Sequence, residues 1–262
     1  MRAYRLVLVF ICFLGHATLR PARLLGAPGQ TRFGSLDDIK QSMESGGGTM
    51  RDYLETFRVG ETEFAVVRVP VGSGLPSSAV SIMVRAADGT YLRIMKTSPI
   101  SWSLAVGLRE RRLEVTQSFE GVDRPFMSFM LDGRNWERAR QPDIDLGTGG
   151  SWDIEDSEDA LRRSVASESG SAEIKKFSAG ALSFIVVIEQ LAPELQKVRV
   201  YHQTSSDKWY PTFDVGPLDG KITAVEVNGE LVVARTAGTD TRTVFSMPLR
   251  EVYPRSVAAE AR

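Results

Sequence analysis

The feature that most constrains the fold is a succession of short segments of alternating polarity, separated by turn dipeptides. Asp88-Gly89, Asp132-Gly133 and Asn228-Gly229 each lie between two such segments, and Asp219-Gly220 precedes another. Asn-Gly and Asp-Gly readily adopt the positive φ angles of a two-residue hairpin turn. The pattern predicts an all-β chain of antiparallel hairpins. Beyond the turn-flanking segments, it places strands at FAVVRVPV, SWSLAVGL, RLEVTQSF, LSFIVVIE, KVRVYHQ and WYPTFDV.

A short helix is predicted ahead of this β region, over Ser35–Ser45. Ser35 can cap it, Asp38 follows three residues later, and the apolar residues recur at helical spacing. Three glycines at 46–48 then end the helix. The next residues, from Thr49 to Phe57, are expected to add a further helical turn or two.

The chain divides into two β regions around a polar stretch, residues 137–180, which is rich in Gly, Ser and charged residues. A structureless stretch of this length is unusual inside a compact domain. It is expected to be either an insertion between β units or a linker between two β lobes, with Asp156 or Ser157 capping a short helix. The predicted boundaries are a signal peptide over 1–17, an extension over 18–58, and β regions over 59–136 and 181–255.

Four β units, starting near Thr62, Ile100, Gly180 and Gly220, form a weak sequence repeat. Within it, residues 101–117 can be aligned with residues 221–237. Three unit endings are alike, over 88–97, 197–203 and 241–249. These endings resemble degenerate blades of WD40-type propellers, with Met95-Lys96 and Tyr201-His202 in the signature Trp-Asp positions, although no Gly-His pair precedes them. The resemblance implies a propeller-like array of about four β units. A β-sandwich is the alternative architecture.

The N-terminus has the pattern of a secretory signal peptide. A cationic start is followed by the apolar run Leu6–Leu14 and by small residues at Gly15 and Ala17. This predicts a secreted or endomembrane-lumenal protein. The basic residues 18–34 are expected to form a disordered N-terminus of the mature chain, and a second organelle-targeting segment is the alternative. No later apolar run approaches the roughly 20 residues of a membrane span. Cys12 lies inside the signal, so the mature chain is expected to have no thiol.

Several function classes are disfavoured by composition and motif. Basic and acidic residues nearly balance, at 32 and 33, so no nucleic-acid partner is expected. The chain has no nucleotide-binding glycine motif. His202 is the single histidine after the signal, which disfavours a zinc site or a Ser-His-Asp triad.

An acidic cluster within the polar stretch raises the question of calcium. It starts like an EF-hand loop, but Gly147, Thr148 and Ile154 stand where such a loop needs an oxygen ligand, a glycine and a glutamate. A solvated loop is the simpler interpretation, and no cofactor is predicted. The outside possibility is a Ca²⁺ site of another type, with candidate ligands Asp143, Asp145, Asp153, Glu155 and Asp156.

The predicted function is a non-enzymatic module that binds a protein or a glycan, with candidate ligand-binding residues Trp136, Trp152, Trp209 and Tyr210. One alternative is a carboxylate-based glycoside hydrolase, which needs two facing carboxylates in an aromatic-lined cleft. The aspartates near aromatic residues are Asp132, Asp153, Asp207 and Asp214. Another alternative is a truncated repeat protein without independent activity.

The signal peptide can be tested directly. We expect the mature protein to begin after Ala17, because the small residues at Gly15 and Ala17 match the positions that signal peptidase reads. Mass spectrometry of the N-terminal peptide of the protein from its native source measures this. A peptide that retains Met1 would contradict the secretory interpretation.

Overall fold

The computed structural model confirms a mostly antiparallel β protein with two α-helices and two open sheets. It describes residues 32–45, 53–70, 77–98, 100–101, 103–119, 122–137, 140, 154–168, 171–180, 182–203 and 207–249. The predicted signal peptide and most of the basic segment that follows it lie outside these residues. The described strands form no closed propeller.

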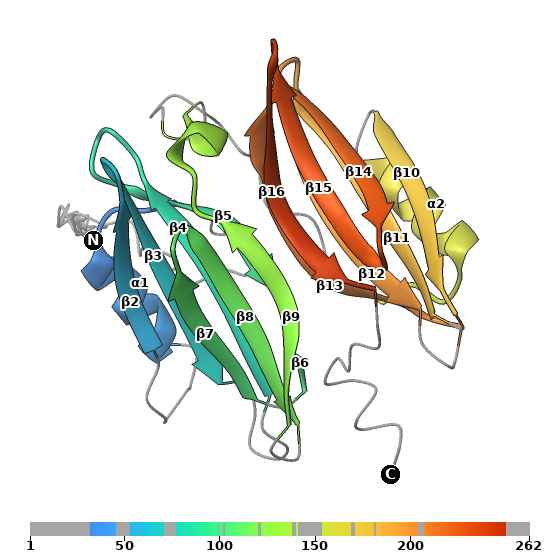
Figure 1. Cartoon of the computed structure of the whole chain (residues 1–262), viewed down its shortest axis with the longest axis horizontal. Coiled ribbons are helices and arrows are strands. Elements are labelled where there is room, and N and C mark those ends of the chain that lie inside the picture. Colours follow the sequence, from blue (N-terminus) through green and yellow to red (C-terminus); the bar gives the residue numbers. More distant parts are fainter. Residues whose placement is uncertain are drawn as a thin grey trace, which may run out of the picture.

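The first sheet, sheet A, has the strand order β10 (Ala172–Ala179), β11 (Leu182–Ala192), β12 (Leu195–Gln203), β13 (Trp209–Asp219), β5 (Tyr91–Thr97), β4 (Ser77–Arg85), β3 (Thr62–Pro70) and β2 (Tyr53–Val59). Two short strands join it, β1 (Arg32–Phe33) beside β5 and β6 (Ile100–Ser101) beside β4. The second sheet, sheet B, has the order β14 (Lys221–Val227), β15 (Glu230–Ala237), β16 (Asp240–Pro248), β9 (Val122–Met130), β8 (Arg112–Phe119) and β7 (Ser103–Arg109). Figure 1 shows the strands of both sheets.

The two sheets share one apolar core, to which both contribute alternate residues. Phe64 and Val200 of sheet A belong to the same buried cluster as Val115 and Phe245 of sheet B. Phe213 joins the layers, because its ring lies 5.0 Å from that of Phe245 and 6.3 Å from that of Phe126. The inward-facing halves of the strands are thereby buried without any helix between them.

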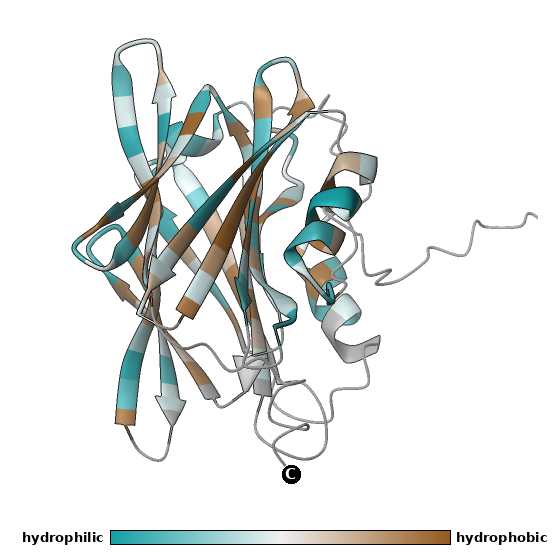
Figure 2. Cartoon of the chain, turned by 90° about the vertical axis from the view of Figure 1, so that its right-hand side faces the viewer, coloured by the Kyte–Doolittle hydropathy of each residue, from teal (hydrophilic) through white to brown (hydrophobic). Residues whose placement is uncertain are grey.

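Both helices lie on the other face of sheet A (Figure 2). α1 (Leu36–Ser45) buries Ile39 against β3, β4 and β5, in a cluster with Ala65, Met83 and Tyr91. α2 (Glu158–Glu168) buries Leu161 and Val165 against β11, β12 and β13. Sheet A is therefore covered on both faces, whereas neither helix covers the outer face of sheet B.

Serine caps begin both helices, as the sequence predicts. The Ser35 hydroxyl accepts a hydrogen bond from the Asp38 backbone N at 3.1 Å, and Ser157 does the same for Ala160 at 3.1 Å. Each cap satisfies a backbone N–H that has no partner inside the helix.

The helical turn expected between Thr49 and Phe57 is wrong in its described part. Tyr53–Val59 forms β2, which pairs with β3 along its whole length through a two-residue turn at Gly60. Gly60 has φ +62°, a value that glycine adopts without strain. Strand pairing with β3 overrides the weak helical spacing of the apolar residues.

Two further elements differ from the sequence interpretation. Within the polar stretch 137–180, the short helix expected after Asp156 or Ser157 is present as α2, but the stretch also contains a strand, β10, that was not expected. Asp132-Gly133 is not a hairpin turn: it begins the 3₁₀ helix η1 (Gly133–Trp136), with Asp132 as its N-cap. Asn228-Gly229 joins β14 to β15, Asp88-Gly89 joins β4 to β5, and Asp219-Gly220 precedes β14, as expected.

The two halves of the chain carry the same ladder irregularities at a constant offset in residue number. The Leu131 backbone N donates to the Arg111 carbonyl at 2.9 Å, and Leu249 donates to Gly229 at 2.9 Å, an offset of 118 residues (249 − 131 and 229 − 111). The same offset relates register shifts in the strand ladders of the two halves. The shift at Ile82/Met83 in the first half corresponds to that at Val200/Tyr201 in the second, and the shift at Val115/Thr116 corresponds to that at Val233/Ala234.

A pseudo-two-fold axis therefore passes through the middle of both sheets. In sheet A, β13 pairs with β5 so that Asp214 lies opposite Lys96, its own counterpart at this offset. In sheet B, β16 pairs with β9 so that Ser246 lies opposite Ser128, again its counterpart. The first half supplies β2–β9 and the second half β10–β16, and each half contributes strands to both sheets.

This arrangement predicts that the halves recognise each other as separate chains. A cut within residues 141–153 would leave one edge of β5 and one edge of β9 open in one fragment, and one edge of β13 and one edge of β16 open in the other, with the shared core exposed. We expect the two fragments, mixed, to form a one-to-one complex detectable by native mass spectrometry. Two fragments that each remain folded monomers in the mixture would contradict this.

Candidate functional site

The predicted aromatic binding residues that the structure describes are buried. Trp136 is 0 % exposed and stacks on Phe129, with ring centroids 5.6 Å apart. Trp209 and Tyr210 are 1 % and 2 % exposed. Trp152 lies outside the described residues. The three described side chains pack in the interior, and a ligand-binding role for them stays a prediction.

Most of the candidate calcium ligands, namely Asp143, Asp145 and Asp153, lie outside the described residues. Glu155 pairs through its backbone with Trp209, and Asp156 is exposed, with its carboxylate 3.9 Å from the Lys208 amine. In the described part of the chain, no three His, Cys, Asp or Glu side chains are grouped so that they could hold a metal ion.

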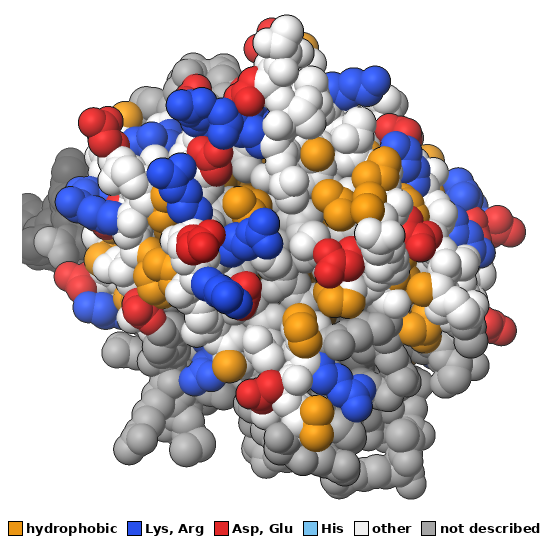
Figure 3. Space-filling model, in the orientation of Figure 1, with side chains coloured by type: hydrophobic (Ala, Val, Ile, Leu, Met, Phe, Trp, Pro, Cys, Tyr) orange, Lys and Arg blue, Asp and Glu red, His pale blue; other side chains and the backbone are white. Residues whose placement is uncertain are grey.

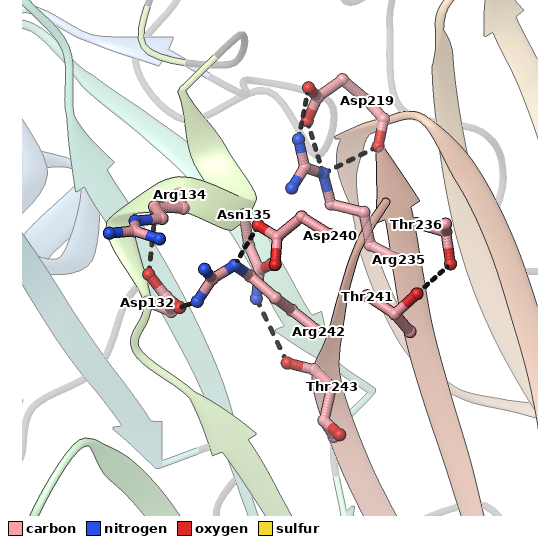
Figure 4. Close-up of polar contacts among 10 residues, drawn as sticks. All are labelled: Asp132, Arg134, Asn135, Asp219, Arg235, Thr236, Asp240, Thr241, Arg242 and Thr243. Carbon is pink, nitrogen blue, oxygen red and sulfur yellow. Dashed lines mark hydrogen bonds and ion pairs between the residues drawn. The ribbon is translucent and has the colours of Figure 1, made fainter. Parts of the chain in front are cut away.

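A polar network ties η1 to the second half of the chain, and it centres on Asp132 (Figure 4). One carboxylate oxygen of Asp132 accepts a hydrogen bond from the Arg134 backbone N at 3.0 Å, and the other lies 2.6 Å from Arg242 Nη1. Arg242 also donates to Asp240 at 2.6 Å. Hydrogen bonds to Asp240 and Asp132 raise the pKa of Arg242, so this guanidinium stays charged.

Two further contacts hold this region rigid (Figure 4). The Asn135 side-chain amide donates to the Thr243 carbonyl oxygen at 3.2 Å, from a fully buried position. At the corner where the chain passes from β13 to β14, Arg235 donates to both carboxylate oxygens of Asp219, at 2.8 and 2.6 Å. The bidentate geometry fixes the corner that leads from one sheet to the other.

A groove on the outer face of sheet B lies over the junction of the two halves, and we call it the junction groove. Its volume is about 410 Å³. Ser128 and Ser246, the pair on the pseudo-two-fold axis, form part of its lining. The other lining residues are Arg112, Met130, Asp132, Glu230, Val232, Arg242 and Thr243.

A second hollow lies between η1 and the β2–β3 turn, and we call it the arginine hollow. Its volume is also about 410 Å³, and Asp132 lines both it and the junction groove. The remaining lining residues are Val59, Gly60, Glu61, Thr62, Arg111, Gly133, Arg134, Glu137 and Arg140.

A smaller adjoining hollow, of about 300 Å³, shares Glu61 and Arg140 with the arginine hollow. Within it, Glu63 accepts a hydrogen bond from the Tyr91 hydroxyl and lies 3.1 Å from Arg58 and 3.8 Å from Arg85. The Tyr91 hydrogen bond and the arginines lower the pKa of Glu63. Burial, followed by the hydrogen bond to Glu63, raises the pKa of Tyr91 to about 12.

Three of the aspartates considered for hydrolysis lie in separate places. Asp132 is held by Arg242, as above, whereas Asp207 is exposed on the β12–β13 loop. Asp214 lies on sheet A, 2.9 Å from Lys197. Near it, burial lowers the pKa of Arg93 and of Lys96. Asp153, the fourth candidate, lies outside the described residues.

His202 is buried in the second half and stacks on Tyr210, with ring centroids 5.9 Å apart. Its Nδ1 lies 3.0 Å from the Thr212 hydroxyl, and its Nε2 has no hydrogen-bond partner among the described residues. Burial lowers the pKa of the imidazole to about 4. At neutral pH the ring is therefore uncharged.

Sequence reasoning missed the arginines of the hollow, because it searched for carboxylates and exposed aromatic residues. A local signal exists in RNWERAR, residues 134–140, where three arginines occur within seven residues. The sequence does not show that Arg111, from the β7–β8 turn, meets Arg134 and Arg140.

No family model matches the chain, and no curated protein matches it. Neither helix in the described part of the chain has the length and hydropathy that a membrane-spanning helix needs.

The burial of His202 predicts a pH dependence of stability. With a pKa of about 4 when folded and about 6.5 when unfolded, the unfolded chain binds the extra proton between these values. Stability is therefore full above the unfolded pKa and is lost as the pH falls toward 4. The contribution is about 3 kcal/mol between about pH 8 and about pH 4.

A His202→Val variant removes this titration, and valine is the residue at the corresponding first-half position, Val84. Urea unfolding at both pH values measures the free energy of unfolding. We expect wild type to lose about 3 kcal/mol more than the variant on acidification, because the other titrating groups are common to both. Equal losses in the two proteins would show that His202 is not held neutral.

Proposed function

We propose that this protein is a non-enzymatic binding module that recognises a protein partner through the outer face of sheet B, centred on the junction groove. The observation that carries the proposal is that this face combines a groove of about 410 Å³ with exposed apolar side chains. As a further part of the proposal, this role belongs to the secretory route, and the N-terminal sequence pattern supports this.

The open face of sheet B supports this assignment. The helices cover sheet A and leave sheet B free (Figure 2). Val225 and Val227 on β14 are 48 % and 47 % exposed, and Val232 on the neighbouring β15 lines the groove. Apolar groups beside a polar-rimmed groove are a common feature of protein interaction sites.

The charges of the groove support a protein as the ligand. Arg112 and Arg242 line the groove together with Asp132 and Glu230, and Met130 and Val232 add apolar lining, so the groove offers both signs of charge and apolar surface. A nucleic acid favours a predominantly basic surface. A glycan site typically offers exposed aromatic rings, and the two described tryptophans are buried.

The settings of the three described candidate aspartates also favour a binder over a hydrolase. Glycoside hydrolysis requires two carboxylates about 5–10 Å apart across a cleft. Asp132 is engaged by Arg242, Asp214 by Lys197, and Asp207 lies on an exposed loop. Each of these aspartates thus has a structural setting of its own.

The proposal predicts that Val232→Arg abolishes partner binding without unfolding the protein. An added charge in the groove would have to be desolvated in the complex, so we expect retention of the partner to fall at least about tenfold. The immobilised mature protein is exposed to an extract of its native source, and retained proteins are quantified by mass spectrometry.

Val122→Arg is the matched control, because Val122 is 54 % exposed on β9 of the same sheet but does not line the groove. We expect this variant to retain the partner, with both variants melting within a few degrees of wild type. If Val232→Arg retains the same partner as the wild-type protein, the proposal is contradicted.

A further inference from the structure

Arg111, Arg134 and Arg140 approach the arginine hollow from three different elements. Arg111 lies on the β7–β8 turn, Arg134 in η1, and Arg140 after η1. None of the three forms an ion pair with a carboxylate in the part of the chain that the structure describes. Figure 3 shows several Lys and Arg side chains, with Asp and Glu side chains among them, over the half of the molecule that carries β2 to β9, in the upper left of the view.

The carboxylates nearby do not neutralise these arginines. Asp132 is bound by Arg242 at 2.6 Å, and Figure 4 shows Arg134 and Arg242 on opposite sides of it. Glu61 and Glu137 are exposed and form no ion pair among the described residues. In the adjoining hollow, Glu63 is shared by two further arginines. The lining of the arginine hollow itself holds three arginines and three carboxylates, and the excess of positive charge comes from Arg242, which engages Asp132, and from Arg58 and Arg85 of the adjoining hollow.

The Arg140 side of the hollow is preorganised. The Arg140 guanidinium donates to the Arg85 carbonyl at 3.2 Å and to the Thr62 hydroxyl at 3.3 Å, and its backbone N donates to Trp136 at 2.9 Å. A Cβ on Gly133 would come within 2.2 Å of the Thr62 hydroxyl, so η1 approaches the β2–β3 hairpin as closely as glycine allows. A ligand would meet donors that are already in place.

The other half of the molecule shows that the fold does not need these charges. Counted from the hairpin turn, where the offset is 120 residues instead of 118, the ladder pair Arg58–Glu63 corresponds to Ser178–Ser183 of the β10–β11 hairpin. Arg85 corresponds to Gln203, and Arg111 to Gly229. Arg58, Arg85 and Arg111 thus have neutral counterparts in the second half, whereas the positions that correspond to Arg134 and Arg140 lie outside the described residues.

We propose that the arginine hollow binds a phosphate group, presented as a phosphate ester by the partner protein of the proposed function, on which this inference rests. One arginine can satisfy a carboxylate through two parallel hydrogen bonds, whereas a phosphate dianion offers acceptor oxygens on several sides. Guanidinium groups that approach from three elements suit the second geometry. The volume leaves room for the group that carries the phosphate.

The test is a calorimetric titration of the intact mature protein, without partner, at low salt and about pH 7.5, where a phosphate monoester is a dianion. The probes are phenyl phosphate, inorganic phosphate and benzoate. We expect saturable binding of phenyl phosphate below roughly 10 mM and weaker binding of benzoate. If inorganic phosphate binds as tightly as phenyl phosphate, the proposal of an ester is overturned, and the free phosphate ion is the ligand instead. No saturation, or preference for benzoate, would overturn the site.

Arg134→Gln and Arg111→Gln are each expected to weaken phenyl phosphate binding about tenfold or more, through loss of a charged hydrogen bond. Arg163→Gln, on the exposed face of α2, is the matched control and should bind as wild type does. Equal weakening in the control would identify non-specific attraction and overturn the proposal. The melting curve of each variant shows whether it is folded, and the second variant keeps the test valid if the first one misfolds.

The outcome is separable from that of the proposed function. Val232 does not line the arginine hollow, so Val232→Arg should still bind phenyl phosphate. If Val232→Arg loses the partner but the wild-type protein binds no phosphate, only the phosphate proposal is overturned. If the wild-type protein binds phosphate but Val232→Arg still retains the partner, only the proposal that the junction groove binds the partner is overturned.

Discussion

The antiparallel pairing of β5 with β13 and of β9 with β16 is the interaction on which the rest of the structure depends. It joins the two halves in both sheets and removes four strand edges that would otherwise be open to association. Because Phe213 of the second half contacts Phe126 of the first and Phe245 of the second, the core also spans the junction. Neither half buries its inward face without the other.

Much of the fold could be predicted from local chemistry. Asn228-Gly229 specifies its own hairpin, and Ser35 and Ser157 begin their helices, because each of these signals acts through a few neighbouring residues. Tyr53–Val59 was harder, since its strand state comes from pairing with β3 rather than from its own pattern. Asp132-Gly133 has a turn signature and begins η1 instead, because Asp132 caps the backbone there and pairs with Arg242.

Register and burial were less predictable, because both depend on partners that are distant along the chain. The sequence alignment of residue 101 with residue 221 is two residues out of register, because Ser103 and Lys221 occupy equivalent positions in the two ladders. Trp136 and Trp209 looked like ligand-binding groups, but the shared core and the α2 cluster enclose them. The two hollows are assembled from separate turns and strands, which no spacing in the sequence reveals.

The repetition of the ladder geometry separates what the fold requires from what a ligand requires. Helices cover sheet A in both halves and leave sheet B open in both, so the open face belongs to each half. The junction groove, in contrast, exists only where the halves meet, because one supplies Ser128 and Met130 and the other Val232 and Ser246. A binding surface on the axis is thus a product of the pairing itself, and the charged turns of the first half make its surroundings asymmetric.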